Sequence, residues 1–223
     1  MTFTDRADAG RQLAARLTEL LDGDGDAGGA GGGGAGGVVV LGLPRGGVPV
    51  AYEVAQALGA VLDVLVVRKL GVPFMPELAM GAIGEGGVKV INPDVVNSLG
   101  ITPETIEEVE GEERAALDRR LTAIRALVPQ RPLAGVVAVV VDDGIATGAT
   151  AAAACAIARA HGAARIVLAA PVVAAASARA LAEVADAVVA VEEPRRMSSI
   201  GRFYDDFGPV PEHEVLEILA RGR

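Results

Sequence analysis

One stretch of the chain presents two acidic side chains and then a loop of small residues in front of a predicted helix. Val139–Val141 is an apolar run typical of a buried strand, and Asp142 and Asp143 follow it directly before a loop that ends in Thr-Gly-Ala-Thr. In open α/β sheets, ligands bind at such strand ends. Successive loop N–H groups at the start of a helix form a cradle for an anion. Carboxylates repel phosphate, so the acidic pair suits sugar hydroxyls or a cation, and the whole stretch favours a sugar phosphate as ligand.

A second segment, Leu43–Pro49, follows the first predicted strand of the chain as a tight turn into a helix. Arg45 supplies a charged donor, and Gly46 and Gly47 allow the backbone to approach a ligand closely. A plain turn could have the same composition. The position of the turn directly after a strand favours ligand binding.

A third segment places two cations, Arg68 and Lys69, at the end of the predicted second strand. The chain then enters Gly71–Gly87, where Pro73, Pro76 and several glycines are expected to interrupt regular structure. We therefore predict a mobile loop with the two cations at its base. The alternative is a basic pair on the surface without a function.

The run from Val139 to Thr150 closely resembles the motif with which type I phosphoribosyltransferases bind phosphoribosyl diphosphate (PRPP): apolar residues, two acidic ones, a short spacer and Thr-Gly-x-Thr. The resemblance extends over roughly Val38 to Phe207. It implies an α/β fold, a parallel sheet flanked by helices, with a mobile loop and a small C-terminal hood. It also implies transfer of the 5-phosphoribosyl group from PRPP to a nitrogenous base or amine, with release of pyrophosphate.

The resemblance assigns the catalytic roles to four residues. Asp142 and Asp143 would contact the ribose hydroxyls and offset positive charge at the sugar ring. Arg68 and Lys69 would contact the pyrophosphate, as an Arg-Lys pair does in orotate-type relatives. Mg²⁺ would be held mainly by PRPP and water near the acidic pair, and the resemblance implies a homodimer.

The resemblance also assigns residues that bind the substrate. The Arg-Gly-Gly turn would hold the pyrophosphate, and the loop from Ala146 to Thr150 would bind the 5′-phosphate. Two aromatic residues of the tail would stack on the acceptor, or else only attach the tail to the sheet. The complete set is Arg45, Gly46, Gly47, Gly144, Ile145, Ala146, Thr147, Gly148, Ala149, Thr150, Phe203 and Tyr204.

Position 146 bears on the identity of the acceptor. Family members that use 6-oxopurines carry an Asp just before the Thr-Gly of the phosphate loop, and this chain has Ala146. Adenine-type members have Ala-Thr-Gly at this place. The resemblance therefore favours an adenine-like base or a small amine over hypoxanthine or guanine, and it leaves the acceptor unidentified.

Short β-branched runs alternate with Ala/Leu-rich stretches from Val38 onward, which indicates a parallel sheet with crossover helices. A long helix is expected to begin at Thr102, a good N-cap, with Pro103 at N1. The predicted strands are 38–43, 62–67, 136–141, 166–173 and 187–191, with a possible hairpin formed by 78–83 and 88–91. The other predicted helices are 6–21, 48–58, 149–161 and 175–184.

The length of 223 residues predicts a single domain over 1–223. Residues 22–37 form a predicted flexible loop, because ten of the fifteen residues from Gly23 to Gly37 are glycine. Residues 194–223 depart from the alternation and form a predicted tail or hood. The tail holds Phe203, Tyr204 and Phe207, half of the six aromatic residues.

Composition excludes several classes of function. A net charge of −9 disfavours binding to nucleic acid, and the longest uncharged apolar runs are too short to cross a membrane. We see no export signal and expect a cytoplasmic protein. Cys155 is the only cysteine and there are two histidines, so a zinc site of the usual kinds is excluded and any metal would be held by oxygens.

Three other kinds of protein share some of these features. A dinucleotide-binding oxidoreductase would need the G-x-G-x-x-G spacing, which Gly144–Gly148 lacks. A domain fused to a hydrolase finds no support, because the chain has no G-x-S-x-G elbow. A non-catalytic regulator that senses PRPP would retain the motif from Asp142 to Thr150, and it stays open as the alternative.

Overall fold

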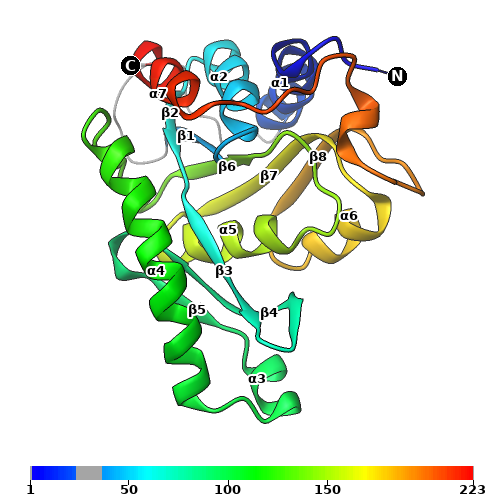
Figure 1. Cartoon of the computed structure of the whole chain (residues 1–223). Coiled ribbons are helices and arrows are strands. Elements are labelled where there is room, and N and C mark those ends of the chain that lie inside the picture. Colours follow the sequence, from blue (N-terminus) through cyan, green and yellow to red (C-terminus); the bar gives the residue numbers. More distant parts are fainter. Residues whose placement is uncertain (1, 24–36, 223) are drawn as a thin grey trace.

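The structure, a computed structural model, describes residues 2–23 and 37–222. Its centre is a five-stranded parallel sheet in the order β2-β1-β6-β7-β8 (Figure 1). The sheet consists of β1 (Val38–Gly42), β2 (Val61–Val64), β6 (Val137–Val141), β7 (Arg165–Val172) and β8 (Ala187–Glu192). The predicted alternation of strands and helices is thereby confirmed. Residues 24–36 of the predicted glycine-rich loop lie outside the described residues.

Helices cover both faces of this sheet, as Figure 1 shows. One face packs against α1 (Arg6–Gly23), α2 (Gly47–Leu58) and α7 (Glu212–Arg221), and the other against α5 (Ala149–Ala160) and α6 (Ala175–Leu181). The side chains of β6 alternate between the two cores: Val139 and Val141 point to the first, Ala138 and Val140 to the second. A strand buried on both faces reads as a continuous apolar run, and the chain has such a run before the acidic pair.

A second, antiparallel sheet in the order β3-β4-β5 extends from the larger one. It consists of β3 (Val67–Val72), β4 (Met75–Gly84) and β5 (Lys89–Ile91), with a short 3₁₀ turn, η1 (Glu85–Gly87), between the last two. The hairpin predicted for this region is confirmed, since Gly81 pairs with Ile91. Helices α3 (Pro93–Leu99) and α4 (Pro103–Arg125) follow, and Thr102 caps α4 by accepting a hydrogen bond from the Thr105 N–H at 3.3 Å.

Two predictions about this region were wrong. The expected second strand over 62–67 is divided: β2 ends at Val64, the buried Leu65 and Val66 form a link, and β3 begins the second sheet. The expected irregular loop, Gly71–Gly87, is mostly strand. Proline is tolerated there because the pairing slips beside Gly71, where an added Cβ would lie 2.8 Å from the Pro76 carbonyl oxygen.

A buried ion-pair network joins the two sheets. Asp63 of β2 is 1 % exposed and accepts hydrogen bonds from Arg125 Nη1 at 2.7 Å and from the Arg131 N–H at 2.9 Å. Arg125, near the end of α4, also contacts Glu85 of η1 at 2.7 Å. Burial lowers the pKa of Arg125, but the hydrogen bonds that Arg125 donates to Glu85 and Asp63 outweigh this effect, and the pKa is raised. The network holds the smaller sheet and α4 against the larger sheet.

The N-terminal segment packs against the C-terminal tail. The Phe3 N–H donates to the Phe203 carbonyl at 2.7 Å, and the Asp205 N–H donates to the Phe3 carbonyl at 2.8 Å. Phe3 is fully buried and packs against Tyr204, the residue that follows the short turn η2 (Ile200–Phe203). The predicted tail is thus joined to the N-terminal segment, although the two are about 200 residues apart in the sequence.

Candidate functional site

Strands β1 and β6 are neighbours in the parallel sheet, so the loops that follow them lie side by side. Gly42 pairs with Val141, and the Leu43 N–H donates to the Val141 carbonyl at 2.8 Å. The turn after β1 therefore lies on the acidic pair after β6. The sequence places these two segments about 100 residues apart, and the sheet brings them together.

The two glycines of the turn are in close contact with the residues at the end of β6. A Cβ added at Gly46 would lie 1.9 Å from Asp143 Oδ2, and one at Gly47 would lie 2.5 Å from the Val141 carbonyl oxygen. Gly46 has φ −63° and ψ −31°, which any residue adopts, so glycine is needed there for space alone. Arg45 is exposed at the surface of this turn, and the Pro44–Arg45 peptide bond is cis.

The loop after the acidic pair leads directly into α5. Its first part is buried: Ile145 is bridged to Val173, and an added Cβ at Gly144 would lie 2.4 Å from Ile200. Gly148 forms the N-cap of α5 at φ +79°, a conformation that favours glycine. The exposed residues of the loop are Ala146, Thr147 and Thr150. The open start of α5 thus has the hydroxyl groups and the N–H groups that a phosphate requires.

The two carboxyl groups have different surroundings. Asp142 Oδ1 accepts a hydrogen bond from the Asp143 N–H at 2.9 Å. Burial, together with the charge of Asp143, raises the pKa of Asp142 to about 7. Burial also raises the pKa of Asp143, although the charge of Arg6 and its hydrogen bond lower it in part. The contact with Arg6 therefore favours the charged form of Asp143.

Arg6, at the start of α1, is a site residue that our sequence analysis missed. Its Nε donates to Asp143 Oδ2 at 2.9 Å, and its Nη2 lies 2.9 Å from the same oxygen. Its Nη1 donates to the Gly208 carbonyl at 2.8 Å, and its guanidinium carbon lies 4.0 Å from the centre of the Phe207 ring. One signal was present in the sequence: a cation in the first turn of a helix opposes the helix dipole and calls for a specific partner.

Tyr204 also holds the acidic pair in place. Its hydroxyl donates to the Asp143 carbonyl at 2.6 Å, and its ring lies between Phe3 at 5.3 Å and Phe207 at 4.7 Å. Burial, with the charge of Asp143 as a second cause, raises the pKa of Tyr204. For Tyr204 the packing favours the second of the two expectations, that the ring attaches the tail to the rest of the chain, because protein rings flank it. Phe203 remains half-buried.

Arg68 and Lys69 lie within β3 rather than at the end of a strand of the parallel sheet. Arg68 Nε donates to Glu113 Oε2 of α4 at 2.6 Å, and Lys69 Nζ lies 3.8 Å from Glu77 Oε2 across the hairpin. In this structure the two cations therefore contact carboxylates of α4 and of the smaller sheet. A role on a pyrophosphate would require these exposed or half-exposed pairs to open.

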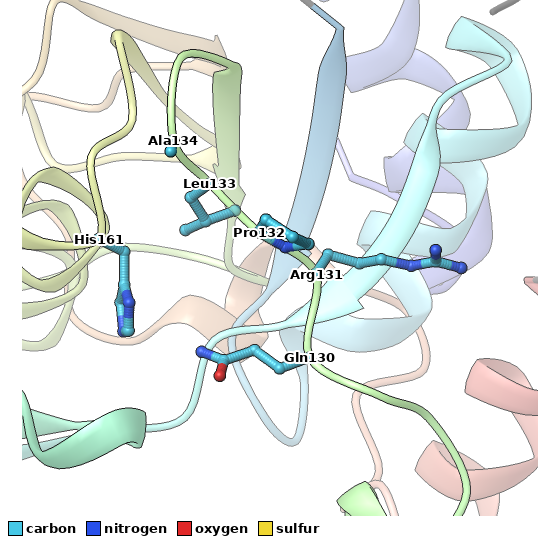
Figure 2. A pocket seen from close by; sticks show the side chains of 6 residues that line it. All are labelled: Gln130, Arg131, Pro132, Leu133, Ala134 and His161. Carbon is cyan, nitrogen blue, oxygen red and sulfur yellow. The ribbon is translucent and has the colours of Figure 1, made fainter. Parts of the chain in front are cut away.

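The opposite edge of the sheet holds a cavity of about 210 Å³. Figure 2 shows its lining, which comes from the segment before β6 and from the end of α5: Gln130, Arg131, Pro132, Leu133, Ala134 and His161. Because these residues precede β6 and β7, the cavity lies at the end of the sheet where these parallel strands begin. The acidic pair lies at the other end, where β6 ends. Arg131 points away from His161, so the two side chains do not converge on one ligand.

The described part of the chain offers little evidence for a reactive cysteine, a metal held by protein side chains or a membrane-spanning helix. Cys155 is buried, and burial raises its pKa to about 12, which makes it a poor nucleophile. Within residues 2–23 and 37–222, no three His, Cys, Asp or Glu side chains are grouped as metal ligands. None of the described helices has both the length and the apolar composition needed to cross a membrane.

Comparisons with known proteins identify the family of the chain. The family profile described as the phosphoribosyl transferase domain matches residues 31–203. The chain therefore belongs to the phosphoribosyl transferase domain family, and the predicted family and fold class, that of the type I phosphoribosyltransferases, are confirmed. The matched segment includes the Arg-Gly-Gly turn, the acidic pair and the phosphate loop.

Two curated relatives from Mycobacterium tuberculosis, Rv0571c of strain H37Rv and MT0597 of strain CDC 1551, are named provisionally as phosphoribosyl transferases. Each is 51 % identical over 219 residues, which cover 98 % of this chain and 46 % of the relative. The chain thus spans about half the length of these relatives. The crystal structure of TT1426 from Thermus thermophilus is 39 % identical, with 99 % of both chains covered and a TM-score of 0.88.

Proposed function

We propose that this protein transfers the 5-phosphoribosyl group from PRPP to a nitrogenous base or amine and releases pyrophosphate. The observation that supports this most directly is the meeting of three segments at one edge of the sheet. The Arg45–Gly47 turn touches the acidic pair, and the pair leads into the open start of α5. Family membership supports transferase chemistry in general terms.

Each segment suits one part of PRPP. The exposed Thr147 and Thr150, with the N–H groups at the start of α5, would bind the 5′-phosphate. The acidic pair would accept hydrogen bonds from the ribose hydroxyls. Arg45, exposed beside the pair, would contact the pyrophosphate, because a guanidinium group suits phosphate oxygens.

The reaction is a displacement at C1′ of the sugar. The acceptor nitrogen forms a bond to C1′ while the bond from C1′ to the pyrophosphate oxygen breaks, and the bonding electrons leave with the pyrophosphate. Arg45 would stabilise the charge that develops on the leaving group, since a preorganised donor contributes about 3 kcal/mol in favourable sites. The proton released by the acceptor would pass to solvent or to Asp205 or Asp206, which are exposed on the tail.

Mg²⁺ fits this site as an ion held mostly by the substrate. The acidic pair supplies two carboxyl groups, and Asp143 Oδ2 is already bound by Arg6, so Asp142 would hold the ion through water while PRPP oxygens supply other ligands. When bound, Mg²⁺ would neutralise charge on the pyrophosphate. The proposal also includes a cytoplasmic homodimer, as the family resemblance implies.

The outer part of the β3–β4 hairpin is the proposed lid. Its tip is exposed, with Phe74 at 66 % and Met75 at 48 %, and its strand pairing is irregular beside Gly71. We expect the tip to close over bound PRPP and to bring Arg68 and Lys69 toward the pyrophosphate, because closure would exclude water from the reaction. Hydrogen exchange in residues 71–79 should slow when PRPP and Mg²⁺ are added. Slowing at the acidic pair alone, with unchanged exchange at the tip, would contradict the lid.

The function is tested with PRPP and Mg²⁺ in two stages. We expect a clear rise in melting temperature at millimolar PRPP, because a ligand at 100 times its Kd stabilises a protein by about 2.7 kcal/mol. Pyrophosphate release is then followed with adenine, hypoxanthine, guanine, uracil, orotate and small amines. We expect turnover with adenine-like bases or amines, because Ala146 supplies no base for a 6-oxopurine proton.

The two stages separate the possible outcomes. No stabilisation by PRPP would overturn the proposed function. Stabilisation without pyrophosphate release for any acceptor would instead identify a protein that senses PRPP without catalysis. Efficient turnover of hypoxanthine or guanine would leave the transferase function intact and contradict the argument from Ala146.

A further inference from the structure

Asp143 is enclosed by groups from three different parts of the chain. Arg6 of α1 binds its Oδ2 through Nε and Nη2, both at 2.9 Å, and the Gly46 backbone passes directly over the same oxygen. The Tyr204 hydroxyl holds its carbonyl at 2.6 Å. The side chain of Asp143 is 14 % exposed. One of its two carboxylate oxygens is therefore committed to protein partners before any substrate arrives.

Arg6 is itself fixed in place. Its side chain is 13 % exposed, its Nη1 donates to the Gly208 carbonyl at 2.8 Å, and it lies over the Phe207 ring. The helix that bears it is anchored to the tail by the backbone bonds of Phe3. A substrate is not expected to displace this guanidinium group, because the group would have to leave several separate partners.

We propose that Arg6 is a positioning residue of the phosphoribosyl site, which fixes Asp143 so that the acidic pair can bind the ribose hydroxyls. This inference rests on the proposed function, since it concerns how the same site recognises PRPP. It adds to that site a residue from the N-terminal helix, outside the segment between residues 31 and 203 that the family profile matches.

Electrostatics gives Arg6 a second effect. Two adjacent carboxylates would repel the phosphate groups of PRPP, and the repulsion is strong in a partly buried site because the local dielectric is low. The Arg6 charge at 2.9 Å neutralises one of them. The pair then presents hydrogen-bond acceptors to the sugar with less repulsion toward the phosphates.

The test is a double-mutant cycle on PRPP affinity, measured by calorimetry with Mg²⁺. Arg6→Gln should weaken PRPP binding about tenfold or more, as expected for loss of a hydrogen-bonded charge pair. Arg6→Lys keeps the charge but not the two-pronged contact, and should restore part of the affinity. Because Arg6 acts through Asp143, the double variant Arg6→Gln with Asp143→Asn should bind PRPP no more weakly than Asp143→Asn alone.

A matched control lies on the same helix. Arg16 is 58 % exposed and is 4.0 Å from Glu19, so Arg16→Gln should leave PRPP affinity unchanged. Thermal melting of every variant checks that it is folded, and Arg6→Lys decides the question if Arg6→Gln does not fold.

Three results would contradict the inference. Wild-type affinity in both Arg6 variants would overturn it, and so would losses that simply add in the double variant. Absence of PRPP binding by the wild-type protein would overturn the proposed function and the inference together, so the two failures are distinguishable.

Discussion

Replacing Asp142 by asparagine is expected to weaken PRPP binding about a hundredfold and to stabilise the folded protein at pH 8. The loss of binding follows because an amide is a weaker acceptor for the ribose hydroxyls than a charged carboxylate. The gain in stability follows because a buried carboxylate beside Asp143 is costly when it is ionised. Asparagine retains the oxygen that accepts the Asp143 N–H at 2.9 Å, so the local backbone should persist.

The pH dependence has a definite sign. In the folded protein the pKa of Asp142 is raised to about 7, whereas an unfolded chain has a value of about 3.9. Between these values the folded state binds more protons than the unfolded state, so the wild-type free energy of unfolding falls as pH rises from about 4 to 7. The asparagine variant lacks this loss. Its advantage should be clearly smaller at pH 5 than at pH 8.

Urea denaturation at both pH values measures the effect, and calorimetry with PRPP measures the binding. Asp118→Asn, an exposed site on α4, is the matched control and should change neither quantity. Equal stability of the Asp142→Asn and wild-type proteins at pH 8 would show that burial and the charge of Asp143 do not destabilise the ionised Asp142 carboxylate. Unchanged PRPP affinity would assign the residue a purely structural role.

The substitution Gly46→Ala is expected to destabilise the protein by about 1–3 kcal/mol and to weaken PRPP binding at least tenfold. An added Cβ would lie 1.9 Å from Asp143 Oδ2, and that carboxylate is held by Arg6. Either the Arg45–Gly47 turn must move away from the acidic pair or Asp143 must leave Arg6. Both changes separate groups that the proposed site requires together.

Gly111→Ala provides the matched control, because the same change is made where nothing lies within 4 Å of the new Cβ. Gly111 is within α4, so alanine should stabilise the helix by about 0.5–1 kcal/mol and leave PRPP binding unchanged. Urea denaturation and PRPP calorimetry on both variants decide the matter. A Gly46→Ala protein with wild-type stability and affinity would mean that the turn is free to move and does not form part of a rigid site.

Much of this site could be predicted from local sequence. The apolar run before Asp142, the small-residue loop and the start of α5 are determined by neighbouring residues, so their order in the sequence already describes a strand, a loop and a helix. The first strand and the turn after it are local in the same sense. Because the carboxyl ends of parallel strands share one edge, the meeting of the turn and the acidic pair could also be expected.

The smaller sheet was harder to predict. The run from Val61 to Val67 is apolar except for Asp63 and contains no Gly or Pro, and the break at Leu65 and Val66 arises where the chain leaves β1 to join a different sheet. Likewise, Pro73 and Pro76 indicated an irregular loop, whereas pairing with β3 across a slipped register makes the segment a hairpin. Pairing between strands depends on partners that a local pattern does not contain.

The sequence by itself determined the family, the alternation of strands and helices in the parallel sheet and the segments that suit PRPP. Only the tertiary structure decided which groups surround the acidic pair. Arg6 and Tyr204 lie 137 and 61 residues from Asp143, and each is an ordinary residue in its own local context. Their roles come from the packing of the N-terminal helix against the C-terminal tail, because burial and ion pairing arise between surfaces and leave no periodic pattern along the chain.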